Sequence, residues 1–557
     1  MKKRYGSDLK DPFMTDYLQA VASSYFDYVA KSFPVMCSSD EFHFVPRAER
    51  AGQYYDRLEN LDSDAITDYI ATLKAFQRKF DRLIAQENDF ERLTDLELLK
   101  ASIGGILIEL DMKASWRHNP LLYLKTAFIG LDYALTKPAG GPEERDRRAC
   151  ARLEAIPRLL EQGIRNIDSV PKTYHRASVA MVSDCQCYLR QTGERLIHFT
   201  SGVAKASSAL DAFGAFLGAL TPLADQEVAA SSLEVTLKDH FLSNRTLPEI
   251  FEIAVEEWHE NEGELNKLQK RIDPDKSWKE LYGTYTPSGV AALDTASLYE
   301  GEIEKLGSFF RANGFGEVDM TSPLELCDTP TYLQSVRSAA SFSAALCADP
   351  REKDLFYMTM HLPRQKGQQA GALLKKRLHR EYKFLSAHET IPGHHLLDSL
   401  RRKSENPIRR QIESALFYEG WAYYAETLLT ECGYVESPVE FLVDHKRRLW
   451  RAARCQVDVG LATGKLARKD AVELVISAGF TSKEAESQID RFRLNPGYQL
   501  CYTLGRYEIM RLRKTYGARW GLDRFHRQLL KGGEIPFHLI EKRFKNQDLT
   551  DAKGDKE

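Results

Sequence analysis

The sequence carries almost no excess of either charge. Its 557 residues include 77 lysines and arginines against 80 aspartates and glutamates, a formal net charge of −3. Proteins that bind nucleic acid need a surplus of positive charge to neutralise phosphates. The balance therefore predicts no nucleic-acid partner, and a hydrophobic content of 43% is typical of a globular protein.

The sequence also lacks a long apolar run. The longest weakly polar stretch, AFGAFLGALTPLA at 212–224, is shorter than the roughly 20 residues that a membrane helix needs. The first residues, MKKRYGSDLKDPF, have a basic start but no apolar segment of the kind found in secretion signals. We therefore expect a cytoplasmic protein with no membrane partner.

Cysteines are few and scattered. There are nine, an odd number, and only Cys185 and Cys187 lie close together, as C-x-C. This is not the usual spacing of a zinc-binding cysteine pair. The pattern predicts unpaired thiols in a reducing compartment.

Helical periodicity dominates what is present. Apolar residues recur at intervals of three and four in the segments 64–86, 93–116, 151–167 and 247–272. This spacing places apolar side chains on one face of a helix. We therefore predict a mainly α fold.

One segment has the character of a strand. DLFYMTMHLP at 354–363 is apolar, aromatic and β-branched, and it predicts a strand of a small sheet. Pro, Asp and Gly collect near 273–290. We therefore predict a helical N-terminal scaffold at 1–280, and a catalytic region at 281–557 that contains the strand.

The chemistry is concentrated in HETIPGHH, residues 388–395. This stretch holds three of the 14 histidines, and Glu389 directly follows the first of them. Zinc hydrolases use two neutral imidazoles, often a carboxylate as third ligand, and a glutamate as general base. In the helical motif H-E-x-x-H the two histidines are one turn apart, but here Pro392 occupies the second position.

An unbroken helix could use neither of the following histidines well. His395, at i+7, would lie about 10 Å further along the axis, and His394, at i+6, would point about 120° away. Pro392 and Gly393 permit a bend, so we predict a zinc helix with a two-residue bulge that returns His394 to the metal. The alternative is a helix–turn junction whose histidines serve as caps or surface residues.

A second motif supplies the remaining groups. IESALFYEGWAYYAETLL at 412–429 has helical apolar spacing and carries Glu419 and Glu426 seven residues apart, on one face. A carboxylate on such an apolar helix is costly unless it is paired or bound to metal. Glu419 is the candidate third ligand, and Glu426 is a candidate to orient a ligand histidine. Pairing of Glu419 with an arginine is the alternative.

Together the two motifs resemble a bacterial family of zincin-like proteins of unknown function, with the signature HExxPGH…EGWAxYAE. EGWA is also similar to the NEGFA-type segment of gluzincin aminopeptidases, whose glutamate binds zinc. The resemblance extends to RLEAIPRLL at 152–160 and NPGYQLCYTLGRYEIMRLR at 495–513. It implies a mainly helical gluzincin-type fold with a small sheet beside the metal site and a deep channel.

The resemblance also implies Zn²⁺ bound by His388, His394 and Glu419, with Glu389 as base and His395 as a bystander. One departure is visible: the family's D-x-G-x-H appears here as DVGLA at 458–462, with Ala462 in the histidine position. Any role of that histidine in substrate binding is therefore in doubt for this chain.

Three further residues are candidates for binding the substrate or stabilising the reacting group. Arg454 lies on a helical stripe with Arg447 and Arg451 and could hold a substrate carboxylate, unless it pairs with Asp458 four residues on. Tyr502, chosen over Tyr498 by the family's Y-x-x-G pattern, could stabilise an oxyanion, with core packing as the alternative.

Arg506, one turn beyond Tyr502, could neutralise the same charge or pair near Glu508. These residues lead us to expect a zinc-dependent hydrolase of amide bonds in short peptides. An amidase acting on a small biosynthetic conjugate and a non-catalytic binding scaffold remain as alternatives.

Overall fold

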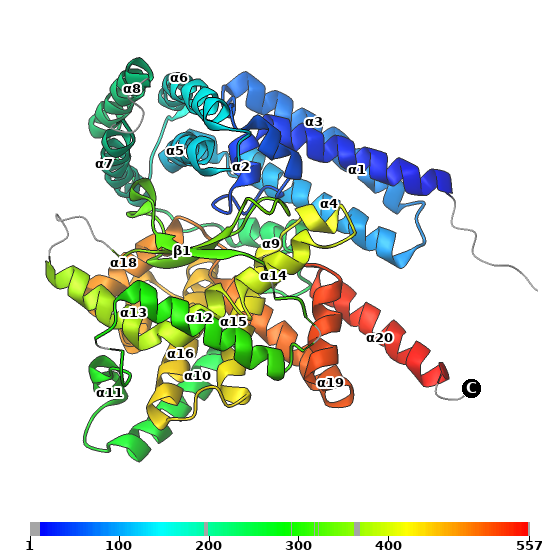
Figure 1. Cartoon of the computed structure of the whole chain (residues 1–557), viewed down its shortest axis with the longest axis vertical. Helices are drawn as coiled ribbons and strands as arrows, with labels where there is room; N and C mark the ends of the chain where they lie inside the picture. The colour runs from blue at the N-terminus through cyan, green and yellow to red at the C-terminus, as the bar shows by residue number, and fades with distance from the viewer. Residues whose placement is uncertain are drawn as a thin grey trace, which may run out of the picture.

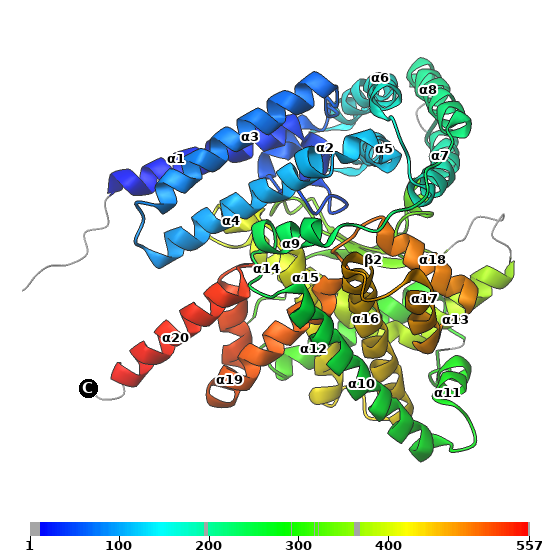
Figure 2. The same ribbon diagram turned by 180° about the vertical axis from the view of Figure 1, so that it is seen from behind.

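A computed structural model describes residues 12–193, 199–290, 292–316, 318–320, 322–360 and 368–554. Most of the described residues are helical, as the periodicity predicts. Figures 1 and 2 show two groups of helices with a small sheet between them. The first group consists of α1 (Pro12–Ser32), α2 (Pro34–Ser38), α3 (Ser63–Ile84), α4 (Phe90–Leu107), α5 (Pro120–Thr136), α6 (Pro142–Asn166), α7 (Lys172–Gly193) and α8 (Thr200–Ala219).

The second group carries both sequence motifs. The short helix α9 (Ala230–Asp239) lies near the sheet. The helices of the second group are α10 (Leu247–Ile272), α11 (Trp278–Thr284), α12 (Thr295–Ala312), α13 (Gln368–Glu389), α14 (His394–Arg402), α15 (Ala415–Glu431), α16 (Pro438–Thr463), α17 (Arg468–Ser477), α18 (Ser482–Arg493), α19 (Leu500–Lys531) and α20 (Phe537–Gly554). No described helix combines the length and the apolarity needed to cross a membrane.

Local sequence signals account for several helix starts. Thr246 caps α10 and Thr481 caps α18, each in a capping box with the glutamate three residues later. Ser437 caps α16, which has Pro438 in its first turn and ends at Gly464 with a φ of 71°. α10 packs along α16, although it precedes the boundary proposed at residue 280, and that division stays a prediction.

The sheet has three short strands in the order β1-β3-β2. β3 (Asp354–Met358) is central; it pairs in parallel with β1 (Leu324–Asp328) and antiparallel with β2 (Ala340–Ser343). The predicted strand is thus confirmed for residues 354–358, while 361–363 lie outside the described residues. It is not an edge strand: β2 provides the edge that borders the site described below.

The helices α15 and α19 cross at unusually close range. A Cβ atom on Gly420 would lie 2.5 Å from the Gly505 backbone, and one on Gly505 would lie 2.2 Å from the Leu416 carbonyl oxygen. Only glycine fits at both positions. This crossing sets Glu419, next to Gly420, beside Tyr502, which lies one turn before Gly505.

Candidate metal centre

The first motif forms a junction between two helices. α13 ends at Glu389, a turn spans residues 390–393, and α14 begins at His394. The expected bulge within one helix is therefore wrong: the chain leaves the first helix and starts a second. A Cβ atom on Gly393 would lie 1.9 Å from the His388 carbonyl oxygen, so the tight return requires glycine.

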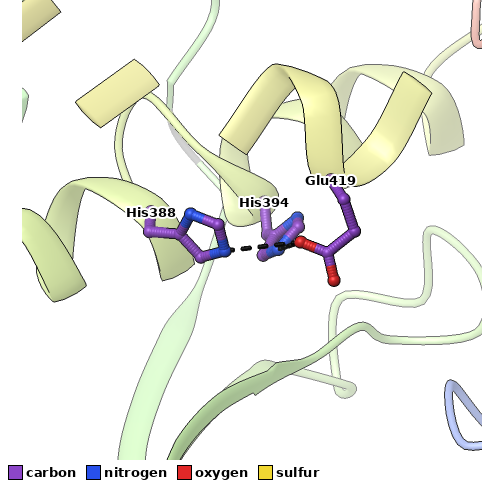
Figure 3. Close-up of side chains that lie close together, drawn as sticks. All are labelled: His388, His394 and Glu419. Atoms are coloured by element: carbon purple, nitrogen blue, oxygen red, sulfur yellow. Dashed lines mark ion pairs between the residues drawn. The ribbon is translucent and has the colours of Figure 1, made fainter. Parts of the chain in front are cut away.

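The junction nevertheless brings the three predicted ligand residues together. His388 Nε2 and His394 Nε2 lie 3.5 and 3.6 Å from the same atom, Glu419 Oε2. The three candidate ligand atoms all lie within 4.8 Å of one another, and the side chains are buried. Figure 3 shows the two imidazoles and the carboxylate, contributed by α13, α14 and α15, directed at one point.

The two oxygens of Glu419 have different environments. Oε1 accepts hydrogen bonds from the hydroxyls of Tyr498 at 2.5 Å and Tyr502 at 2.8 Å. Oε2 is buried and accepts no hydrogen bond from the described residues. Burial alone would raise the pKa of Glu419, but His388 and His394 hold it well below its usual value. A bare anionic oxygen between two imidazole nitrogens is the arrangement that a metal ligand set requires.

The far side of His388 is held by a carboxylate. Its Nδ1 lies 2.9 Å from Glu426 Oε1, so Nδ1–H donates there and Nε2 is left to face Glu419. Without metal, burial lowers the pKa of His388, but the nearby carboxylates of Glu419 and Glu426 outweigh this and raise it to about 9. A metal would displace the extra proton.

Two arginines in turn fix Glu426. Arg447 Nε donates to Oε2 at 2.8 Å and Nη2 to Oε1 at 3.0 Å, while Arg451 donates to both oxygens. Burial would raise the pKa of Glu426, but these two guanidinium groups hold it well below its usual value. Glu426 therefore lies where the sequence predicts it, behind the candidate ligand His388.

The two neighbouring histidines have separate environments. The His394 ring stacks on Tyr418, with ring centres 3.9 Å apart, and its Nδ1 is buried without a hydrogen-bond partner among the described residues. His395 Nδ1 lies 2.7 Å from Asp354 Oδ2 on β3, which also accepts from Arg402. His395 thus connects α14 to the sheet and takes no part in the three-residue group.

A cavity of about 740 Å³ opens onto this group and lies between the two helix groups. Its lining includes His388, Glu389, His394 and Glu419, together with residues 338–342 of β2 and the segment before it. Glu389 is 8% exposed, and no described residue donates a hydrogen bond to its carboxylate. It is therefore available to a bound molecule.

Arg454 and Arg506 have different positions. Arg454 lines the cavity, and its guanidinium carbon lies 3.9 Å from the centre of the Tyr502 ring. It does not pair with Asp458, which instead accepts backbone hydrogen bonds at the start of α19. Arg506 lies elsewhere, bound to Glu257 and Thr427, so its expected place beside the reacting group is wrong. Its helix position, one turn beyond Tyr502, turns it towards α10.

Tyr502 and Tyr498 make the same contact. Both hydroxyls donate to Glu419, so the choice of Tyr502 alone, made from the Y-x-x-G pattern, misses Tyr498. Their spacing of four residues places both side chains on one face of a helix, and this could have identified Tyr498 as well. Tyr418 and Arg491, both in the cavity lining, were also missed, because no local pattern distinguishes them. Ala462 packs against the apolar core and contributes nothing to the cavity.

The architecture and site define a mainly helical protein with a small three-stranded sheet and a buried group of two histidines and one glutamate. The comparison with family models identifies its relatives: residues 46–544 match the family described as "Bacterial protein of unknown function (DUF885)". The chain belongs to this family. A search of curated proteins returned no match.

Two solved structures share the fold. One, a "putative lipoprotein of unknown function" from Shewanella oneidensis, has a TM-score of 0.71 and 19% identity, over 95% of this chain and 99% of that one. The other, a "putative lipoprotein" from Colwellia psychrerythraea, has a TM-score of 0.74 and 18% identity, over 96% and 98%.

These descriptions contradict the cytoplasmic location predicted from the sequence. Lipoproteins are held at a membrane by an attached lipid rather than by an apolar helix. The prediction is wrong because it relied on the lack of apolar runs, and such an absence does not establish where a protein is located. The nine cysteines are free, as predicted, but free thiols alone do not establish a reducing compartment.

Proposed function

We propose that the protein is a zinc-dependent hydrolase of amide bonds in short peptides. The observation that carries the proposal is Glu419 Oε2, a buried and otherwise unbonded carboxylate oxygen that faces the Nε2 atoms of His388 and His394. Two imidazoles and one carboxylate are a common ligand set of catalytic zinc, which leaves a further position open.

Zinc bound there would acidify water and polarise the carbonyl of the substrate. The chain's own residues supply the remaining chemistry. Glu389 directly follows His388 and borders the cavity, so its carboxylate can take the proton of the attacking water and then donate it to the leaving amine. Glu426 keeps the Nδ1 proton of His388 in place, and Tyr498 and Tyr502 orient Glu419.

The sheet offers a way to bind an extended substrate. β2 pairs with β3 and lies at an edge of the sheet, and residues 338–342 line the cavity. An edge strand can hold a peptide through backbone hydrogen bonds, as the sheet edge of zincins does. The resemblance of HETIPGHH and EGWAYYAE to zincin motifs supports the same proposal.

The experiment begins with the metal content of the purified protein. We expect about one zinc per chain by elemental analysis, and an anomalous-scattering peak in a crystal beside Glu419. Wild type should hydrolyse members of a short-peptide panel, whereas Glu389→Gln should keep the metal and lose activity by about 10²- to 10⁴-fold.

Three results would change the proposal. Hydrolysis of small N-acyl conjugates in preference to every peptide would favour an amidase. Absence of stoichiometric zinc, together with no hydrolysis after zinc is added, would exclude both enzymes and leave a binding scaffold. Equal activity of wild type and Glu389→Gln would remove Glu389 from the mechanism.

A further inference from the structure

Two arginines on the wall of the cavity lack an anionic partner. Arg454 and Arg491 both line the cavity, and neither forms an ion pair with a carboxylate of the described residues. A positive group that borders a cavity without a counter-charge is available to an anionic ligand.

Arg454 is held rigidly without being neutralised. Its Nε and Nη2 donate to the neutral Gln499 Oε1 at 2.9 and 2.6 Å. Its guanidinium carbon lies over the ring of Tyr502 at 3.9 Å and within 6.0 Å of the centres of two other aromatic rings, Trp450 and Phe492. These contacts preorganise the planar fork and leave its charge in place.

Arg491 comes from the end of α18. Among the described residues, its guanidinium donates one hydrogen bond, from Nη2 to the carbonyl oxygen of Val336 at 3.3 Å. The Arg491 side chain is exposed to solvent, and both desolvation and, next, the charge of nearby Arg454 lower its pKa. The nearby carboxylate of Glu41 is already bound by Lys125 at 2.6 Å and by Arg337 at 3.0 Å.

Other arginines of the cavity are neutralised. Arg447 and Arg451 bind Glu426, and Arg377 lies 3.5 Å from Glu381. Arg493, two residues beyond Arg491, pairs with Glu227 and with Asp225. The absence of a partner therefore distinguishes Arg454 and Arg491 from their neighbours of the same chemistry.

The position of the pair relates it to the metal centre. Arg454 stacks on Tyr502, and the hydroxyl of that tyrosine donates to Glu419 at 2.8 Å. A single tyrosine side chain therefore separates Arg454 from Glu419, a short separation for an extended peptide that advances about 3.5 Å per residue.

We propose that Arg454 and Arg491 form a subsite for the carboxylate of the substrate, so that the hydrolysed bond lies one or two residues from a free carboxyl terminus. This inference rests on the proposed hydrolase and names its substrate class: short peptides with a free C-terminal carboxylate. A guanidinium fork matches a carboxylate in geometry as well as in charge.

The first test compares each peptide of a panel with its C-terminal amide. Wild type should prefer the free acid by about 10- to 100-fold in kcat/KM, mostly through KM, because a charge-assisted contact is lost with the amide. Arg454→Met and Arg491→Met should each lower kcat/KM for the acid by a similar factor and leave the amide nearly unchanged. Arg493→Met is the matched control and should keep the preference for the acid.

The second test measures binding without turnover. Isothermal titration of the Glu389→Gln protein with N-acetyl-phenylalanine and with its amide should show tighter binding of the acid, which Arg454→Met abolishes. Arg454→Lys keeps the charge but not the fork and should restore part of the affinity. Circular dichroism of each variant checks that the fold is retained.

Failures of the two proposals give different results. If no amide bond is cleaved but the acid still binds through both arginines, the proposed carboxylate subsite is supported and the proposed hydrolase activity is wrong. If peptides are cleaved with equal kcat/KM as acids and amides, or if each arginine variant loses activity equally on both, the carboxylate subsite is wrong and the hydrolase stands.

Discussion

Two walls of the cavity differ in whether their charged side chains form ion pairs. On the wall with the three candidate ligands, Glu426 is held by Arg447 and Arg451 and itself holds His388. On the wall with Arg454 and Arg491, neither guanidinium forms an ion pair with a carboxylate of the described residues. Paired charges fix the positions of side chains, whereas unpaired charges beside a cavity are available to a ligand.

The largest effect should come from the ligand group itself. His388→Ala removes one of three candidate ligands, and we expect loss of stoichiometric zinc and of activity. His395→Ala is the matched control, because its side chain binds Asp354, which also pairs with Arg402. It should keep the metal and lose only stability. Zinc content by elemental analysis measures both, and loss of zinc in His395→Ala would reverse the assignment.

The next prediction compares how much an arginine on each wall contributes to the free energy of unfolding. Arg447→Met leaves Glu426 and Glu381 short of a buried partner, and we expect the free energy of unfolding to fall by about 3–5 kcal/mol. Arg454→Met removes a charge that has no carboxylate partner and should cost less. Urea unfolding of both variants measures the difference. If both variants lost the same free energy of unfolding, ion pairing on the first wall would not contribute to stability.

Glu426→Gln tests the link between the paired charges and the metal. The amide keeps the shape of the side chain but weakens its hold on the Nδ1–H of His388. We expect zinc affinity to fall by about 10- to 100-fold. Competition with a chelator measures this affinity. Glu381→Gln, which also contacts Arg447 but not the ligands, is the control and should leave zinc affinity nearly unchanged.

Lys446 gives a pH-dependent prediction on the otherwise paired wall. It is buried against Tyr282 and Phe480, and burial lowers its pKa from 10.5 to about 7. Folding therefore disfavours its charged form: the penalty is full below pH 7 and disappears as pH rises towards 10.5. Relative to wild type, Lys446→Met should be most stabilising near pH 7, with the advantage shrinking by on the order of 1 kcal/mol per pH unit up to pH 9.

Thermal unfolding of wild type and Lys446→Met at pH 7, 8 and 9 checks this expectation. The two stability curves should converge as the pH rises. Curves that stay parallel would show that Lys446 keeps its proton throughout the range in the folded protein.

The smallest effect concerns the tyrosines. Tyr498→Phe or Tyr502→Phe removes one of two donors to the same oxygen of Glu419, so each alone should lower zinc affinity by less than about tenfold. The double variant should lose more than either. A large loss of turnover in Tyr502→Phe, with zinc affinity kept, would instead support its predicted role at the oxyanion.

Several features of the fold and site were predictable because they depend on local pattern. Apolar spacing predicts the helices, the β-branched run at 354–358 predicts a strand, and the two motifs contain the three residues that converge. The bulge was wrong because local sequence cannot distinguish a bent helix from two helices joined by a tight turn. That choice depends on how Gly393 packs against the His388 carbonyl and how Trp421 donates to the Pro392 carbonyl.

Residues brought in from distant segments could not be predicted in this way. Arg491 and Val336 meet across 155 positions of the chain, and His395 meets Asp354 across 41. Arg506 was misplaced because helical spacing gives a face but not the neighbour on that face. It faces Glu257 of α10 rather than the metal centre.

Local sequence was enough to name the candidate residues, since imidazoles and carboxylates at these spacings have few roles on apolar helices. Their partners depend on packing between segments that are distant in the sequence. The close crossing at Gly420 and Gly505 sets two tyrosines on one oxygen of Glu419 and leaves the other oxygen bare. It also decided which arginines are neutralised, because a counter-charge acts through distance in space, not through separation along the chain.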